Sequence, residues 1–473
     1  MDGLDFQEIK KSELENEFTI GAEYYGKKYV ESISVVKQQK KTIPLGQMWI
    51  LATDGDHGSP DYQESGVLYL LSECVKEGYI EKAKCRYITE AKNRELKRSC
   101  LHPGDIVVTK TGVYFGKSAV IPESIPEANT IAHVGKITLK SQYNPYYVST
   151  FLNCKYGYYQ LRRRGIKATR PEIKLVEFPD IVIPEFSDRL YSAVEASVRK
   201  ANTLLELASG TMELSAKLVM DSLAIGSSYA ERISKALVSF KNSFQLTGRL
   251  DAEYYQPKYD GYLSALEQFE TTKIPNEFDV LKNSGTNYAE GVSDVGVIKT
   301  KQLTNTGVNT DGIESYFTHE TCIENKSTFV VNNDVVFASM GVGSLGKVSL
   351  FSYDGDKPFV TDSTLRIYRA KETACVLPEV LCIFLQSTIG QELIYRYVVG
   401  STGIINIYDD DIAKIPIPVL DAEIQKDIAA KVQESFALRR QSKQLLEYAK
   451  QAVEIAIEQR EDVALAWLKD KVE

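Results

Sequence analysis

The chain has 473 residues, of which 43% are hydrophobic and 25% charged, and this composition excludes a disordered or collagen-like protein. Its formal net charge is −8, which excludes a uniformly basic nucleic-acid coat but leaves room for local DNA-binding surfaces. No apolar run approaches the ~18 residues of a membrane span, and the acidic, polar N-terminus predicts no signal peptide.

The cysteines and histidines give no sign of a metal or catalytic site. The 7 cysteines contain no CxxC pair, and an odd number without paired spacing favours reduced thiols in a cytoplasm over a disulfide or zinc framework. The histidines, His57, His102, His133 and His319, form no set with ligand spacing. We therefore expect no metal site and no catalytic site, and a binding function instead.

An internal repeat is the strongest feature of the sequence. AEYYGKKY at 22–29 returns as AEYYQPKY at 252–259, an offset of 230 residues. At nearly the same offset, Asp105 and Gly112 in GDIVVTKTGVYFGKSAV align with Asp334 and Gly341 in NDVVFASMGVGSLGKVSL. A unit of this length is too long for a solenoid. We predict a duplicated domain that forms a pseudo-two-fold object.

Both copies have the same predicted order of elements. Short β-type runs come first: VLYLL, DIVVTK and KSAVI in one copy, and VGVIKT, DVVFAS and KVSLF in the other. A short helix follows, opening at Pro145 and at Pro378, because proline suits the first helical turn. A proline-bounded extended segment comes next, at 178–184 and 414–418, and a long helix ends each copy.

The two long helices are predicted from apolar residues that step by threes and fours, beginning near Ser187 and near Asp421. A narrow stripe sustained over ~60 Å of helix needs a long partner. We expect the helices to pack on each other as an antiparallel coiled coil, with each helix capping its own domain as the alternative. The predicted class is α+β: mixed α/β domains at 1–185 and 226–420, and long helices at 186–225 and 421–473.

Two glycine-rich stretches imitate phosphate-binding motifs. The run from Gly341 to Gly346 fits G-x-G-x-x-G, but a nucleotide fingerprint must open a helix, and the strand-like KVSLFSY follows here. The first copy has Gly112 to Gly116 in the same place, also followed by a strand. A hairpin turn therefore fits better than a nucleotide site, and absence of ATP binding would exclude a nucleotide-hydrolysing enzyme.

These two turns, at 109–115 and 338–345, occupy equivalent places but carry different side chains. Glycine lets a backbone approach a ligand closely. We predict that the differing residues read DNA bases, with a plain surface hairpin as the alternative. They are Lys110, Thr111 and Tyr114 in the first copy, and Ser339, Met340 and Ser344 in the second.

Positive charge collects at 161–174 (LRRRGIKATRPEIK) and at 81–98. Flexible cations neutralise phosphates, and planar arginine reads base edges. An ordinary solvated surface is the alternative. The predicted DNA contacts here are Arg162, Arg163, Arg164, Lys167, Thr169 and Arg170, with Lys299 and Lys301 in the less basic second copy.

Over essentially its whole length the chain resembles the specificity subunit of Type I restriction-modification systems. Residues 54–60 (DGDHGSP), which include His57, are similar to the Asp-Gly-x-His-x-x-Pro stretch that opens the first recognition domain. Both hairpins resemble its Gly-Asp-Ile-Leu … Gly-x-x-Gly-Lys hairpin, and 400–407, which include Ser401 and Thr402, resemble its Gly-Ser/Thr-rich segment. The first copy departs from this last pattern, so the two domains should read different bases.

The resemblance implies two target-recognition domains that read a bipartite, asymmetric double-stranded DNA sequence, without catalysis or a cofactor in this chain. It implies two modification (methyltransferase) subunits as partners, which bring S-adenosylmethionine, and often restriction (nuclease-translocase) subunits. Two alternatives stay open. A methylation-only or other phage-defence system would use a nearly identical subunit, and genomic neighbours would decide. A structural coiled-coil scaffold would show no sequence-dependent DNA affinity.

Overall fold

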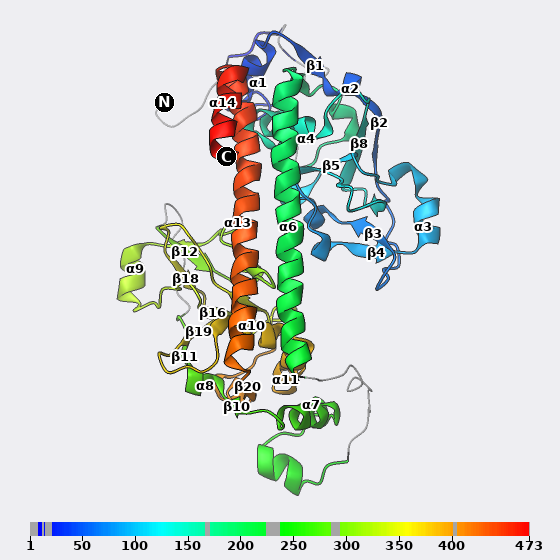
Figure 1. Ribbon diagram of the computed structural model, residues 1–473. Coiled ribbons are helices and arrows are strands. Elements are labelled where there is room, and N and C mark those ends of the chain that lie inside the picture. Colours follow the sequence, from blue (N-terminus) through cyan, green and yellow to red (C-terminus); the bar gives the residue numbers. More distant parts are fainter. Residues whose placement is uncertain are drawn as a thin grey trace. The chain divides into compact units, whose positions relative to one another are not determined.

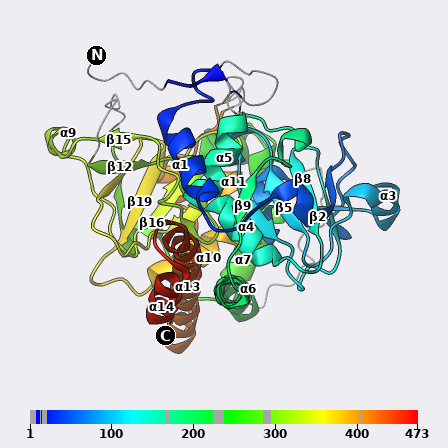
Figure 2. The ribbon, with the colours of Figure 1, turned by 90° about the horizontal axis from the view of Figure 1, so that it is seen from above.

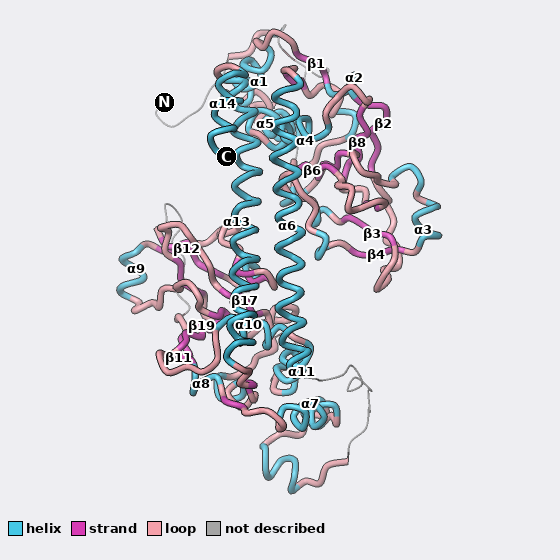
Figure 3. The backbone as a smooth tube through the Cα atoms, in the orientation of Figure 1, coloured by secondary structure: helices cyan, strands magenta, loops and turns pink. Residues whose placement is uncertain are grey.

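The structure is a computed structural model that describes residues 8–11, 14, 21–165, 171–223, 237–284, 294–400 and 404–472 (Figure 1). The chain divides into two compact units. Unit 1 comprises Met1–Leu205 with Arg440–Glu473, and unit 2 comprises Glu206–Arg439. In both units short strands alternate with longer loops and helices (Figure 3). Within the described ranges, none of the helices combines the length and the apolar character that crossing a membrane requires.

Unit 1 is organised around an antiparallel four-stranded sheet in the order β2-β8-β5-β6, with a three-stranded sheet β4-β3-β7 and a pair β1-β9. The strands are β1 (Thr42–Pro44), β2 (Trp49–Asp54), β3 (Val67–Leu70), β4 (Arg86–Ile88), β5 (Ile106–Thr109), β6 (Ser118–Val120), β7 (Ala128–Thr130), β8 (Val134–Leu139) and β9 (Val182–Pro184). The helices are α1 (Lys27–Lys37), α2 (Leu45–Met48), α3 (Glu90–Glu95), α4 (Pro145–Asn153) and α5 (Lys155–Gly165). Helices α1 and α5 lie side by side (Figure 2).

Unit 2 repeats this topology, which confirms the predicted domain duplication. Its sheets have the orders β11-β19-β16-β17, β15-β12-β18 and β10-β20, with an added pair β13-β14. The strands are β10 (Thr271–Thr272), β11 (Phe278–Leu281), β12 (Val295–Ile298), β13 (Leu303–Thr304), β14 (Gly307–Val308), β15 (Tyr316–Phe317), β16 (Val335–Ala338), β17 (Val348–Leu350), β18 (Phe359–Thr361), β19 (Leu365–Ala370) and β20 (Ile417–Pro418). The helices are α7 (Lys258–Leu266), α8 (Ile274–Glu277), α9 (His319–Glu324), α10 (Pro378–Gln386), α11 (Thr388–Arg396) and α12 (Asp409–Ile412).

Repeated residues make the same local structures in the two units. The Thr89 hydroxyl caps α3 by accepting a hydrogen bond from Lys92 N, and the Thr318 hydroxyl caps α9 by accepting one from Thr321 N, each at 3.1 Å. The predicted short helices begin at the two prolines, as α4 and α10. Local sequence signals therefore determine these helix starts identically in both copies.

The two long helices are α6 (Asp188–Leu223) and α13 (Ala422–Glu458), and they pack together in each unit, as expected (Figure 1). The first half of α6 and the second half of α13 share the core of unit 1, through Leu190, Val194, Val198 and Ala201 and through Leu445, Ala449, Val453 and Ala456. In unit 2 the other halves meet, and Ser435 Oγ donates to Ala208 O at 2.7 Å. This reversed order makes the pair antiparallel.

The second long helix ends earlier than the predicted boundary at residue 473. Helix α13 stops at Glu458, and a separate helix, α14 (Glu461–Val472), follows. Ala464 of α14 is buried in the core of unit 1. A turn at this point lets the chain bring α14 back onto its own unit, which one continuous helix could not do.

Gly78 and Gly307, matched in the repeat, both lie against α13. Their φ angles are +87° and +106°, where glycine is favoured. A Cβ atom at Gly78 would lie 2.7 Å from Leu446 Cδ2, and one at Gly307 would lie 3.0 Å from Phe436 Cε1. The repeated glycine therefore allows the long helix to approach each domain closely.

We expect Gly78→Ala to destabilise unit 1 by about 1–3 kcal/mol, because overpacking adds to the backbone strain. Gly104→Ala is the matched control, since Gly104 has a φ of +90° but no atom within 4 Å of a Cβ. Urea unfolding of both variants measures the difference. Equal losses in the two variants would show that contact with α13 contributes nothing.

Candidate nucleic-acid interface

The turns that join β5 to β6 and β16 to β17 share one backbone frame, and both are hairpins, as predicted. Gly112 N donates to Pro171 O at 3.0 Å in unit 1, and Gly341 N donates to Ile405 O at 3.0 Å in unit 2. Both glycines have positive φ, +73° and +103°. Each turn is therefore attached to a later segment of its own unit, which fixes where its side chains lie.

The predicted reader residues of unit 1 differ in exposure. Lys110 is buried, and its Nζ donates to Asp54 Oδ2 at 2.9 Å. Thr111 is also buried, and its Oγ1 has no hydrogen-bond partner within the described ranges. Tyr114 is half-buried, with Lys76 Nζ 5.3 Å from its ring centre. Tyr114 is thus the most accessible of the three. Lys110 affects the surface indirectly, because it holds the carboxylate of Asp54.

Asp54, at the end of β2, lies beside several basic side chains. Besides Lys110, Arg98 Nη2 lies 3.4 Å and His57 Nε2 3.8 Å from Asp54 Oδ1, and the side chains of Arg98 and His57 are 66% and 74% exposed. Burial alone would raise the pKa of Asp54, but the hydrogen bond and charge of Lys110, with the charges of His57 and Arg98, lower it below its usual value. The result is an ionised carboxylate that orients exposed donors.

The residues predicted from the sequence include His57 and Lys110 but neither Asp54 nor, by itself, Arg98. Two signals were present, since Asp54 opens the DGDH stretch and Arg98 ends the basic stretch at 81–98. A carboxylate considered from the sequence alone gives no reason to expect a DNA contact, because its charge repels phosphates. Only the fold shows that the Asp54 carboxylate contacts the neighbouring basic side chains.

The turn of unit 2 has a different chemistry. Ser339 is buried, and its Oγ donates to Thr364 O at 2.9 Å, while Met340 and Ser344 are half-buried. At the tips of the two turns, Val342 is 65% and Val113 91% exposed. Neither valine is among the residues predicted from the sequence, although a Gly-Val pair is present at the same place in both copies.

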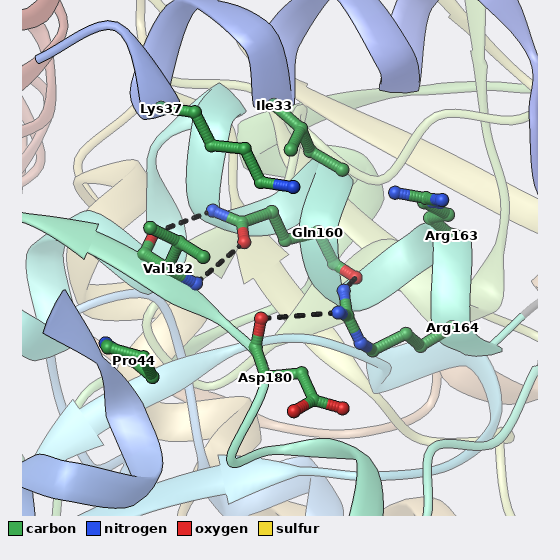
Figure 4. A pocket seen from close by; sticks show the side chains of 8 residues that line it. All are labelled: Ile33, Lys37, Pro44, Gln160, Arg163, Arg164, Asp180 and Val182. Atoms are coloured by element: carbon green, nitrogen blue, oxygen red, sulfur yellow. Dashed lines mark hydrogen bonds between the residues drawn. The ribbon is translucent and has the colours of Figure 1, made fainter. Parts of the chain in front are cut away.

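Arg163 and Arg164 are not surface cations, contrary to the sequence-based prediction. Each is only 4% exposed. Arg163 Nε donates to Tyr24 O at 2.9 Å, with its guanidinium 3.9 Å from the Tyr24 ring centre. Arg164 donates to Gln160 O and Asp180 O at 3.3 and 3.2 Å, at the edge of a pocket of about 390 Å³ (Figure 4). Both guanidinium groups are used inside unit 1, so neither is proposed as a DNA contact.

The same arrangement explains the repeated AEYY sequence. In unit 2 the guanidinium of Arg396 lies 4.9 Å from the centre of the Tyr254 ring, as Arg163 lies over Tyr24 in unit 1. Cation–π contact with a desolvated arginine stabilises such a pair. The tyrosines are therefore structural platforms in both domains.

The remaining predicted residues are scattered. Arg162 is half-buried, with its guanidinium 5.9 Å from the Phe115 ring centre, and Lys301 forms an ion pair with Glu314. Lys299 is half-buried at the end of β12. Outside the described residues lie Lys167, Thr169, Arg170, Ser401 and Thr402.

We expect Arg163→Ala to cost about 1.5–3 kcal/mol of stability, the usual value for losing a buried hydrogen bond from a charged group. It should not alter the salt dependence of DNA binding. Arg162→Ala, the matched neighbour, should leave stability nearly unchanged and reduce the log–log salt slope by about one if it contacts a phosphate. Denaturant unfolding and binding titrations at several salt concentrations measure both. A reduced slope with normal stability in Arg163→Ala would contradict this assignment.

Comparison with known proteins gives one family. Residues 258–448 match the model of the Type I restriction modification DNA specificity domain. No curated protein sequence matches the chain.

Among solved structures, the chain is similar to a Type I restriction-modification S subunit from M. genitalium, with 11% identity and a TM-score of 0.36, over 90% of this chain and 95% of that one. It is also similar to the HsdS subunit from Thermoanaerobacter tengcongensis, with 12% identity and a TM-score of 0.29, over 89% and 97%. At TM-scores this low, these likenesses carry no argument, and the match to the family model covers residues 258–448.

Proposed function

We propose that both units recognise DNA and that each reads one part of a bipartite, asymmetric target. Residues 258–448 match the Type I restriction modification DNA specificity domain, and unit 1 has the same sheet topology as unit 2. A single observation carries this proposal. The two hairpin turns share a backbone frame but present different side chains. A shared frame with different side chains is what two readers of unlike sequences require.

The proposed partners follow from that role. Two modification subunits would bring S-adenosylmethionine and the methylation chemistry to the site that this chain selects, and restriction subunits would cleave where they accompany it. This chain would contribute recognition without catalysis and would act in the cytoplasm, where the DNA is.

The Asp54 cluster and the exposed turn tip form the proposed DNA surface of unit 1. Arg98 and His57 offer exposed donors for phosphates or base edges, while Val113 and Tyr114 offer apolar and aromatic contact. Lys110 would hold Asp54 in place and would not contact DNA itself. Specificity in this unit therefore depends on the turn and on the end of β2 together.

Exchanging the turn of unit 1 (110–114) for the turn of unit 2 (339–344) tests this proposal. We expect the methylated sequence to become relaxed at one or two base pairs in one part of the target, each worth about 1–3 kcal/mol. Methylome sequencing of a host that expresses the chain with its modification subunit gives the readout.

The control for this exchange is Leu207→Ala, because Leu207 is 55% exposed on α6, away from both turns in the sequence. It should leave the methylated sequence unchanged. An unaltered sequence after the turn exchange, with activity retained, would remove the turns from the reading surface. Loss of all sequence dependence in DNA binding would instead favour a structural scaffold.

A further inference from the structure

Three side chains of metal-binding types, Cys100, His102 and Glu127, meet on one face of unit 1. Leu101 pairs with Ala128 in an antiparallel bridge, with N–H···O distances of 2.7 and 3.1 Å. Side chains alternate along an extended segment, so Cys100 and His102, on either side of Leu101, share a face. Antiparallel pairing then places Glu127 opposite His102.

The donor atoms are close enough to share one ion. Cys100 Sγ lies 3.1 Å from Glu127 Oε1 and 3.8 Å from His102 Nε2, and all three atoms lie within 4.8 Å of one another. Thiolate, imidazole and carboxylate are the ligands that Zn²⁺ uses in proteins. Cys100 is buried, whereas His102 and Glu127 are exposed, so an ion can enter from solvent.

The second copy shows that the fold does not require these side chains. Val330 N donates to Phe359 O at 2.9 Å, as Leu101 N does to Ala128 O, so this bridge is equivalent. The flanking positions there hold Phe329, Val331 and Pro358, none of which is a metal ligand. Unit 1 therefore has three side chains of ligating type where unit 2 has three residues that cannot ligate a metal.

We propose that Cys100, His102 and Glu127 bind a zinc-type divalent cation, with water in the fourth position. The ion would join the segment before β5 to the start of β7, inside the recognition unit but on residues that the DNA proposal does not use. Three protein ligands with an open position suit exchangeable binding better than a closed four-ligand framework.

Metal binding exchanges a proton for the ion. Without metal, the Cys100 thiol donates a hydrogen bond to Glu127 Oε1. Zn²⁺ binds the thiolate, and the thiol proton is released to solvent.

Cobalt substitution tests the site directly. After chelator treatment, the full chain is titrated with Co²⁺ alone, and we expect one equivalent to give a sulfur-to-cobalt charge-transfer band in the near ultraviolet that Zn²⁺ then removes. Cys100→Ser should abolish the band and weaken Zn²⁺ binding by more than about 100-fold, beyond the loss typical of second-sphere changes. His102→Val, which places the residue type of the second copy on an exposed position, should weaken binding while the fold is kept.

Cys375→Ser is the matched control. The Cys375 thiol also donates to a carboxylate, Glu277 Oε2, at 3.3 Å, and no histidine completes a group there among the described residues. This variant should keep the full band. Absence of a thiolate band in the wild-type chain, or an unchanged band in Cys100→Ser, would overturn the proposal. Either result would leave the DNA-recognition proposal intact, because its readout is the methylated sequence.

Discussion

Replacing residues 21–187 with the corresponding domain of another specificity subunit changes one part of the methylated DNA sequence and leaves the other part unchanged. This is the expected result because unit 1 has its own sheets, its own core and its own reading turn, and unit 2 repeats each of them. The exchange ends just before α6, so the residues of α6 and α13 that pack on each other in unit 1 are retained. Methylome sequencing identifies both parts of the sequence in one experiment.

The size of this effect follows from the discrimination between specific and non-specific DNA, typically 10³–10⁷-fold. An exchanged reader should reduce modification of the original target to the non-specific level. The reciprocal exchange of 237–420 is the control, and it should change only the other part. A change in both parts from one exchange, or in neither, would contradict one reader per unit.

The repeated architecture could be predicted from the sequence because its signals are local. Short apolar runs of β-type residues, such as 105–110 and 334–339, form β5 and β16, and Pro145 and Pro378 begin their helices. The glycine-rich turns were correctly interpreted as hairpins because strands follow them. Each of these inferences depends on residues within one element or its neighbour.

The roles of charged side chains could not be predicted in the same way. Arg163 belongs to a basic run, and nothing in that run shows that its guanidinium faces Tyr24, 139 residues earlier in the chain. A buried cation of this kind stabilises the interior of the domain, whereas an exposed one would be available to contact a ligand. The Cys100 and Glu127 pair was also hidden, since only antiparallel pairing across 27 residues brings them together.

Asp105→Ala should destabilise unit 1 by about 3–5 kcal/mol, because it leaves the buried Lys136 cation without its carboxylate counter-ion. Asp105 Oδ2 lies 3.0 Å from Lys136 Nζ and accepts a hydrogen bond from His102 N at 2.8 Å. The two charged side chains are only 5% and 7% exposed. Unit 2 has an equivalent ion pair. Asp334 Oδ2 lies 2.7 Å from Arg369 Nη2 and accepts a hydrogen bond from Val331 N.

Two further variants separate the cost of an unpaired charge from the value of the pair. The double change Asp105→Leu with Lys136→Met should recover much of the lost stability, because replacing both partners of a buried pair by apolar groups is often neutral. Lys301→Ala breaks an exposed ion pair with Glu314 and should change stability by no more than about 1 kcal/mol. Urea unfolding of the four proteins supplies the comparison. If the double variant were as unstable as Asp105→Ala, the carboxylate of Asp105 would stabilise unit 1 through the hydrogen bond that it accepts from His102 N. The same loss of stability should then follow from Asp334→Ala in unit 2.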